Sequence, residues 1–500
     1  WATMEIPEVL QTYLDVTPIR NLMSPLNAVT AAMGEASGLP EDQLDFLLLF
    51  ILAYPLALIH RQIYNPTLRH IFAMVFGILT VIYVIGNQVY HSFFSTLVAY
   101  IILRAMPNKL GSKLIWVWAF GYMATSHLYR QYVDYLGWTV DFTTTQMVIT
   151  LKMIALGCNA QDGHTKDKSS LSSRQKSLAL GPGELPSLLE YYSYMHFWCT
   201  VLPGPFFEYK QYISFIDRSM FKETNGEIPA GSLKAFAFLW LKLLVVIYGV
   251  ITAFSYPISN LHDAEFIANT TFQYRWFYLL VCCMCIRSKY YTGWLMSEGA
   301  SILCGFSFNG YDAQKNAKWD RLTNINLVGV ELAQNLRHVV AEWNKGTALW
   351  LKNYVYFRVS KRPLREGEDP KTTKRPGLPP AQGQLVVYVV SAIWHGFYPG
   401  YYYFFVGYFF FSHVGNSLGP WVTSRVYKEG TVLGHIYTAF CILLTLTVLD
   451  YNAASFAVLA HSYSIEVWTG FYFYLHIIIV VLFGLVSAGF FRPPRRAPKK

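Results

Sequence analysis

A histidine in apolar surroundings is the first candidate for chemistry. His395 lies in "SAIWHGFYPGYY", between the uncharged runs "GQLVVYVV" and "VGYFFFS". An ionisable side chain is costly at membrane depth and therefore marks a candidate functional site. A neutral imidazole suits a general base, because its unperturbed pKa of about 6.5 is close to working pH. A structural histidine, hydrogen-bonded to a neighbouring helix, is the alternative; the small Gly396 and the helix-breaking Pro399-Gly400 favour the catalytic role.

The second candidate is Asn344, in "AEWNKGTALWLKNYVYFR", residues 341–358. Apolar and basic residues are interspersed there, which predicts one amphipathic helix at the cytosolic surface. Lys345 and Lys352 suit the phosphate groups of an anionic ligand, although a plain interfacial anchor needs the same charges. An asparagine on such a helix is commonly structural, so the local pattern alone does not assign Asn344 a role.

Several other chemistries have no motif in a fitting context in this sequence. The one G-x-S-x-G match, "GNSLG" at 415–419, lies at the end of an apolar run and does not follow a strand as a nucleophile elbow would; there is no H-E-x-x-H and no glycine-rich phosphate loop. The seven cysteines do not form two C-x-x-C motifs that could pair to hold a metal, so neither a metal site nor a disulfide scaffold is expected. This favours a base that acts directly on a bound substrate, with no covalent intermediate, no metal and no bound cofactor.

The elements that must position these residues are apolar helices. The chain of 500 residues is 53% hydrophobic and only 14% charged, against about 25% charged in ordinary soluble proteins. We therefore predict an all-α polytopic membrane protein with about eleven transmembrane helices plus re-entrant and amphipathic helices. The expected spans are residues 44–60, 70–86, 88–103, 114–130, 143–158, 233–256, 274–291, 384–397, 400–417, 430–450 and 468–490. The apolar stretches 186–205 and 291–308 are interpreted as re-entrant or tilted helices.

Basic residues set the expected orientation. The net charge of +10 is carried by short loops between the spans, which should face the cytosol. No basic stripe interleaves with exposed aromatics, so no nucleic-acid partner is expected. The whole chain, 1–500, is then one membrane-embedded domain with a lumenal N-terminal segment, 1–43, and a basic cytosolic tail, 491–500. Asn269, in the acceptor triplet "NTT", is predicted to lie in the lumen.

Four blocks of this sequence, in order, carry a resemblance to the membrane-bound O-acyltransferase family, and specifically to its lysophospholipid acyltransferase branch. The resemblance covers most of the chain from about residue 44 to 490. The blocks are "PSLLEYYSYMHFWCTVLPGPFFEYKQYISFI" (186–216), "GYDAQKNAKWDRLTNI" (310–325), "EWNKGTALWLKNYVY" (342–356) and "SAIWHGFYPGYY" (391–402).

The resemblance implies an eleven-span, multi-pass enzyme of the endoplasmic reticulum membrane that remodels phospholipids. Such enzymes transfer an acyl chain from the cosubstrate acyl-CoA to the free hydroxyl, here expected at sn-2, of a lysophospholipid. The blocks look most like those of ethanolamine- and serine-preferring members, with choline as a further head group. Membrane lipids are expected partners, and the sequence leaves a homo-oligomer open.

The resemblance also assigns residue roles. The family's catalytic histidine falls on His395 and its asparagine on Asn344. His395 would accept the proton of the attacking hydroxyl, while Asn344 would either donate a hydrogen bond to the developing oxyanion or position the acyl carbonyl. Residues expected to bind substrate are Trp343, Lys345, Lys352, Trp394, Gly396, Glu190 and Pro205.

Two alternatives stay open at this point. The same fold could acylate a protein or a sterol, or the chain could be a non-enzymatic lipid transporter whose buried His395 and Asn344 line a pathway. A transporter should survive His395→Ala, whereas an acyltransferase should lose turnover while still binding acyl-CoA.

Overall fold

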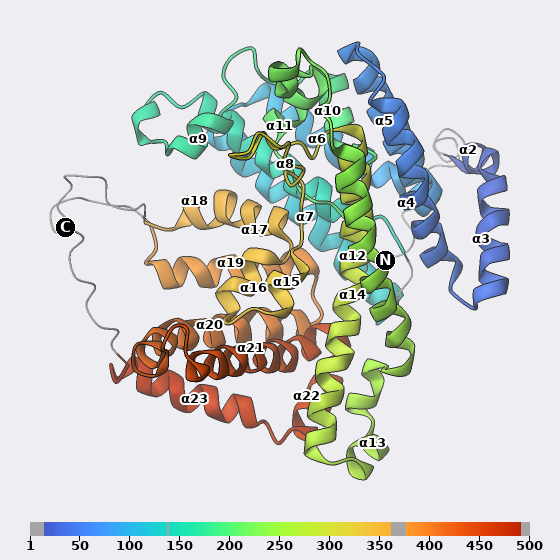
Figure 1. The fold of residues 1–500 in the computed structure, drawn as a ribbon. Coiled ribbons are helices and arrows are strands. Elements are labelled where there is room, and N and C mark those ends of the chain that lie inside the picture. The colour runs from blue at the N-terminus through green and yellow to red at the C-terminus, as the bar shows by residue number, and fades with distance from the viewer. Residues whose placement is uncertain (1–14, 138–139, 362–376, 492–500) are drawn as a thin grey trace. The chain divides into compact units, whose positions relative to one another are not determined.

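A computed structural model of the chain describes residues 15–137, 140–361 and 377–491 (Figure 1). Over these residues the elements are helices, with two isolated β-bridges, Tyr311–Ala317 and Ser360–Leu378. The all-α prediction is therefore confirmed for the described residues. The expected cytosolic tail falls, apart from Phe491, outside them, as do residues 1–14 of the expected lumenal segment.

The chain divides into two compact units. The first unit comprises residues 1–243 and 293–323, and the second comprises residues 244–292 and 324–500. The boundaries fall within two long helices, α12 (Ser232–Thr252) and α14 (Phe272–Cys304). The prediction of one domain stays a prediction, and each unit is described by itself.

The first unit contains the N-terminal apolar helices and the shorter helices that follow them. Asn65 caps α5 by accepting a hydrogen bond from the Leu68 backbone N–H, and Pro66 occupies the first turn, where its missing N–H costs nothing. The helices wholly in this unit are α2 (Thr17–Leu22), α3 (Ser24–Ser37), α4 (Glu41–His60), α5 (Pro66–Ile85), α6 (Val89–Ala105), α7 (Lys109–Val133), α8 (Thr143–Gly163), α9 (Ser173–Leu178), α10 (Leu188–Met195) and α11 (Tyr209–Ile216), with 3-10 turns η1 (Gly86–Gln88), η2 (Lys168–Ser170) and η3 (Ser219–Thr224).

The second unit contains both candidate catalytic residues. Helix α20 packs against α19, α21 and α23, and a buried aromatic and aliphatic cluster that includes Tyr451 and Trp468 forms the core. Its remaining elements are η4 (Ala253–Ser255), η5 (Ile258–His262), α13 (Ala264–Asn269), α15 (Leu327–Glu331), α16 (Leu336–Glu342), α17 (Lys345–Trp350), the π-helical turn η6 (Leu351–Tyr356), α18 (Phe357–Val359), α19 (Pro380–His395), α20 (Pro399–Val426), α21 (Val432–Val458), α22 (His461–Gly470) and α23 (Tyr474–Ser487).

Several helices are long and apolar enough to cross a bilayer. Among the described residues these are Gln43–His60, Pro66–Ala105, Ser232–Ser255 and Val432–Val458. The pair α22 and α23, bent by 87°, qualifies if it is one span. Every span predicted from the sequence falls on a helix within a few residues, the last of them on this bent pair. The chain is thus a multi-pass helical membrane protein.

The stretch 291–308, expected to be a separate re-entrant or tilted helix, is instead the continuation of a longer helix. Helix α14 continues without interruption from the expected span 274–291 to Cys304. The stretch contains isolated glycines but no proline, and a single glycine costs a helix only about 1 kcal/mol. The other unusual stretch, 186–205, does break: α10 ends at Met195 and the next helix begins at Tyr209.

Candidate functional site

His395 is the last residue of α19, at a sharp break in the chain. Gly396 follows with φ +126°, a backbone conformation that residues with a Cβ rarely adopt. Helix α20 then starts at Pro399, whose fixed φ suits a first helical turn. The helix break expected from Pro399-Gly400 is confirmed, and it places the imidazole at a helix end.

Four aromatic rings surround the imidazole of His395. Trp394, itself buried, stands edge-on at 4.7 Å between ring centroids. Tyr401 and Phe405 of α20 contribute rings at 5.6 and 5.3 Å, and Phe456 of α21 one at 5.0 Å. Rings from three helices therefore fix the position of the histidine and make its surroundings apolar.

A close approach of α20 and α21 brings these rings together. The Gly400 N–H donates to the Leu459 carbonyl at 2.8 Å. A Cβ at Gly400 would lie 2.0 Å from the Ser455 carbonyl oxygen, a distance at which backbone would have to move. Only glycine fits this contact, and the contact fixes the start of α20 against α21 beside His395.

Asn344 lies in a break between two helices, so the prediction of one amphipathic helix over 341–358 is wrong. Helix α16 ends at Glu342, Trp343 is extended, and Asn344 has the left-handed angles φ 45° and ψ 54°. Helix α17 then begins at Lys345 and passes directly into the π-helical turn η6. Asparagine tolerates left-handed backbone better than most residues, and π-helical turns are frequent at functional sites.

The buried Asn324, only 1% exposed, holds the Asn344 turn. Its side-chain Nδ2 donates to Asn344 Oδ1 at 3.2 Å, and its Oδ1 accepts from the Gly346 N–H at 2.9 Å. The Asn324 backbone carbonyl also accepts from the Lys345 N–H at 2.9 Å. The sequence pattern does not single out Asn324, which there looks like an ordinary polar residue of a polar loop.

The segment that Asn344 begins packs against the helix that His395 ends. Helix α17 continues into η6, and η6 packs against α19. Figure 1 shows α16, α17, α18 and α19 together in yellow and orange within the second unit. Both candidate catalytic residues therefore belong to one packed group of short helices.

The residues expected to bind substrate near Asn344 have these contacts. Lys345 Nζ lies 2.7 Å from Glu342 Oε2, in an ion pair across the Asn344 turn. Lys352 Nζ lies 5.7 Å from the centre of the Phe357 ring. Trp343 packs edge-on against the rings of Tyr290 and Tyr291. Their proposed contacts with substrate stay predictions.

Two other expected substrate-binding residues lie in the first unit. Glu190 is the third residue of α10, and its Oε2 accepts from the Ser187 N–H at 2.7 Å while the Ser187 hydroxyl accepts from the Glu190 N–H. This reciprocal pair is a capping box, which accounts for a carboxylate at that position. Pro205 is buried in the turn after α10.

A buried ion cluster in the second unit was also missed. Arg287 of α14 donates to both carboxylate oxygens of Glu331, each at 2.8 Å, and also to Asp450 of α21. The Tyr291 hydroxyl donates to Glu331 Oε1 at 2.6 Å. Glu331 ends α15, so the cluster connects the segment before Asn344 to two long helices. The sequence places the charged Arg287 and Asp450 within apolar spans, and such charges indicate a buried partner or a functional site.

The first unit holds a further buried charge. Lys152 of α8 is fully buried, and its Nζ donates to the carbonyls of Tyr194 at 2.8 Å and Met195 at 3.3 Å. These carbonyls end α10, where a cation is favoured by the helix dipole.

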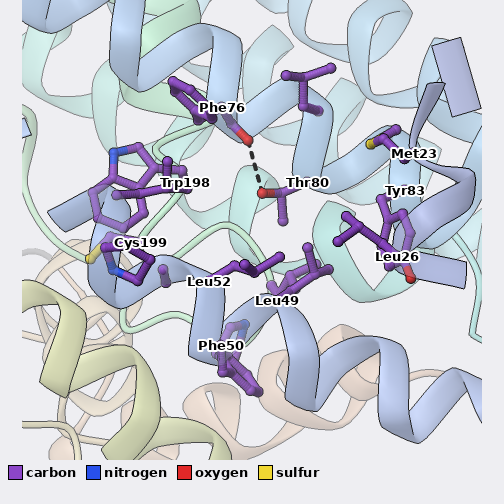
Figure 2. A pocket seen from close by; sticks show the side chains of 16 residues that line it. Met23, Leu26, Leu49, Phe50, Leu52, Phe76, Thr80, Tyr83, Trp198 and Cys199 are labelled. Carbon is purple, nitrogen blue, oxygen red and sulfur yellow. Dashed lines mark hydrogen bonds between the residues drawn. The ribbon is translucent and has the colours of Figure 1, made fainter. Parts of the chain in front are cut away.

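The apolar pocket has a volume of about 280 Å³ (Figure 2). Its lining comes from α4, α5, residues near the start of α3 and the turn 198–203. The Thr80 hydroxyl on its wall donates to the Phe76 carbonyl at 2.8 Å. No histidine or carboxylate lines the pocket, so its walls suit hydrocarbon and provide no general base.

No cluster that could hold a metal occurs among the described residues: none brings three or more histidines, cysteines, aspartates or glutamates together. The cysteines in the same part of the chain are free thiols, six of them buried.

The chain is similar to several known proteins. A model of the membrane-bound O-acyltransferase family matches residues 112–448. The chain is 30% identical to lysophospholipid acyltransferase 6 of Drosophila melanogaster over 93% of its own length and 64% of the relative, so it spans just under two thirds of that protein. It is 31% identical to a lysophospholipid acyltransferase of Schizosaccharomyces pombe, over 90% of this chain and 87% of the relative. The human membrane-bound glycerophospholipid O-acyltransferase 1 is 28% identical, over 90% of each chain.

Proposed function

The chain belongs to the membrane-bound O-acyltransferase family, and on that premise we propose that it is an enzyme that transfers an acyl chain from acyl-CoA to the free hydroxyl of a lysophospholipid. The names of the relatives from fly and fission yeast support a lysophospholipid acceptor. The observation that carries the proposal is His395 at an interrupted helix end inside an aromatic shell, on a helix packed against the segment that Asn344 begins.

His395 is the proposed general base. Its imidazole accepts the proton of the lysophospholipid hydroxyl as that oxygen attacks the thioester carbonyl carbon of acyl-CoA. The attack forms a tetrahedral intermediate whose oxyanion accepts a hydrogen bond from Asn344. When the intermediate collapses, the C–S bond breaks and the thiolate takes the proton back from the imidazolium. The products are a diacyl phospholipid and free CoA, with no covalent enzyme intermediate.

The apolar shell protects the reaction from a competing one. A thioester beside a general base is hydrolysed if water can take the place of the lipid hydroxyl. The rings of Trp394, Tyr401, Phe405 and Phe456 restrict water around the imidazole. The shell therefore favours transfer to a lipid that enters from the bilayer.

We further propose that the chain crosses the endoplasmic reticulum membrane eleven times and acts at the sn-2 hydroxyl of lysophospholipids with ethanolamine, serine or choline head groups. The phosphates of CoA would approach Lys345 and Lys352, whose charges suit them. Trp343, Trp394 and Gly396 would line the reacting centre, and Glu190 and Pro205 would support the lipid.

The test uses purified protein in detergent, labelled oleoyl-CoA and a panel of 1-acyl lysophospholipids that differ in head group. We expect labelled diacyl product and release of free CoA in equal amounts, with ethanolamine or serine head groups preferred. Oleate without CoA should give no product, because it lacks the thiolate leaving group.

Other outcomes contradict the proposal. If acyl-CoA binds but no lysophospholipid is acylated, a protein or sterol is the acceptor. If acyl-CoA does not bind and the protein instead moves lipid between the leaflets of vesicles, it is a transporter.

A further inference from the structure

The side chain of Asn344 does not cap the helix that it precedes. An asparagine at this position normally accepts a hydrogen bond from the backbone N–H two or three residues later. Asn344 is the residue before α17, yet its side chain makes no capping hydrogen bond. Its carboxamide is therefore available for another purpose.

Asn324 caps α17 in its place. The Asn324 Oδ1 accepts from the N–H of Gly346, the second residue of α17, at 2.9 Å. This is the bond that an asparagine at position 344 would ordinarily make. Asn324, 20 positions earlier in the chain, thus caps the start of α17. The Asn344 side chain is not needed for the cap.

The other end of the Asn324 side chain orients Asn344. Asn324 Nδ2 donates to Asn344 Oδ1 at 3.2 Å. A carboxamide has one acceptor oxygen and one NH2 group with two donors. Because the oxygen is bound to Asn324, the NH2 group is the end that Asn344 presents elsewhere.

The surroundings make Asn324 a rigid support. It is 1% exposed, and its backbone carbonyl accepts from the Lys345 N–H at 2.9 Å. The Asn326 N–H donates to the Glu342 carbonyl at 3.1 Å on the other side of the turn. The two segments are therefore bonded together on both sides of Asn344, which keeps its left-handed backbone in place.

We propose that Asn324 is a positioning residue that caps α17 and turns the Asn344 carboxamide so that its NH2 group faces the reacting centre. The inference rests on the proposed function and deepens it: it gives the structural reason why Asn344 presents a donor, and not its oxygen, to the oxyanion. The Asn344 NH2 group then faces a substrate oxygen that becomes negatively charged. It does not face a hydrogen-bond donor of the substrate.

The discriminating variant is Asn324→Asp. A carboxylate keeps the acceptor for the Gly346 N–H but cannot donate to Asn344 Oδ1. The Asn344 carboxamide then turns to donate to the carboxylate and presents its oxygen to the developing oxyanion. We expect kcat to fall about 100-fold or more, as for loss of an oxyanion donor, with KM for acyl-CoA and Tm close to those of the wild type.

Two further variants separate positioning from folding. Asn324→Ala removes both bonds, and we expect a lower Tm and a kcat at least tenfold below the wild type. Asn335→Ala is the matched control: Asn335 caps α16 by accepting from the His338 N–H at 3.0 Å. It should lower Tm to a similar extent and leave kcat unchanged. If Asn324→Asp does not fold, Asn324→Ala against Asn335→Ala still decides the question.

The same changes in an Asn344→Ala background complete the test. We expect Asn324→Asp to cause no further loss of kcat there, because the group that it positions is gone. Wild-type kcat in Asn324→Asp, or a loss that multiplies with that of Asn344→Ala, would overturn the positioning role alone. Wild-type kcat in Asn344→Ala would instead overturn the donor assigned under the proposed function, and the positioning role with it.

Discussion

The two proposed catalytic residues are fixed by different kinds of contact. Aromatic rings from three helices surround His395 at centroid distances of 4.7–5.6 Å. Asn344 instead receives a hydrogen bond from Asn324, in a turn bonded on both sides to the segment 324–326. Ring packing sets where a side chain lies, whereas a hydrogen bond also decides which end of a carboxamide points to the substrate.

That difference matches what each residue is proposed to do. The rings around His395 fix its position and make its surroundings apolar, as a base that must exclude water requires. An asparagine that stabilises negative charge must present nitrogen and not oxygen, so it needs a directional partner. His395 is held by ring packing, and Asn344 is held by a hydrogen bond from Asn324.

The largest effect on stability should come from the ion cluster of Arg287, Glu331 and Asp450, which connects the segment before Asn344 to α14 and α21. Arg287→Met leaves the buried Asp450 and the half-buried Glu331 without their cation. We expect a loss of about 3–5 kcal/mol in the free energy of unfolding, measured by thermal unfolding in detergent. Lys289→Met, on the exposed side of the same helix, is the control and should leave Tm unchanged. Equal Tm values for the two variants would mean that the cluster does not stabilise the unit.

Loss of the hydrogen-bond donor itself should be the next largest effect. Asn344→Ala removes the carboxamide, and we expect kcat to fall by about 10²–10³ while KM for acyl-CoA changes little. The measurement is steady-state formation of diacyl product. Asn335→Ala, which removes the cap of α16, serves as a control. If both variants lose activity equally, Asn344 acts through the fold and not as a donor.

Loosening the packing around His395 should cost less than removing a donor. Phe405→Leu removes a ring that stacks on the imidazole at 5.3 Å. The histidine then gains freedom, and we expect kcat to fall about tenfold, within the range for a small misplacement of a catalytic group. Phe409→Leu, one turn further along α20, contacts His413 instead and should leave kcat unchanged. A rise in KM larger than the fall in kcat would contradict a purely positional effect.

The smallest expected effect concerns the ion pair across the Asn344 turn. Partial burial alone raises the pKa of the Glu342 carboxyl, but the hydrogen bond and charge of Lys345, together with a hydrogen bond from Asn326, outweigh burial, so the pKa is lowered from its ordinary value of 4.5. The pair therefore stabilises the fold above pH 4.5 and this contribution is lost as the pH falls below that value.

Glu342→Gln measures this contribution. We expect the variant to be less stable than the wild type by at most about 1 kcal/mol at pH 7, because both side chains are partly exposed. Thermal unfolding at a series of pH values should show the difference shrinking as the pH falls below 4.5. A difference that persists in acid would mean that Glu342 acts by packing and not by charge.

The sequence was sufficient to find His395 and the helices around it, for a physical reason. A single imidazole among Trp, Ile and Phe is conspicuous, and the proline and glycines next to it mark the helix break that the structure contains. Apolar runs of about 20 residues likewise identify membrane helices, because the bilayer leaves few other ways to satisfy the backbone.

Asn324 and the turn at Asn344 could not be predicted in this way. The pattern over 341–358 fits a helix throughout, and the break arises from hydrogen bonds to a residue 20 positions away. Such contacts leave no local signal. Lys152, Arg287 and Asp450 are different, because charges within apolar runs are visible in the sequence; what the sequence could not supply was their partners.

His395 is proposed to be the base for acyl transfer to a lysophospholipid. The test measures acyl-CoA binding and a single turnover in purified His395→Ala. The control is His413→Ala, which removes a histidine packed against Phe409 and Phe483. We expect both variants to bind acyl-CoA as the wild type does, and the transfer rate to fall by about 10²–10⁴ in His395→Ala only. Transfer at the wild-type rate in His395→Ala would show that His395 is not the base.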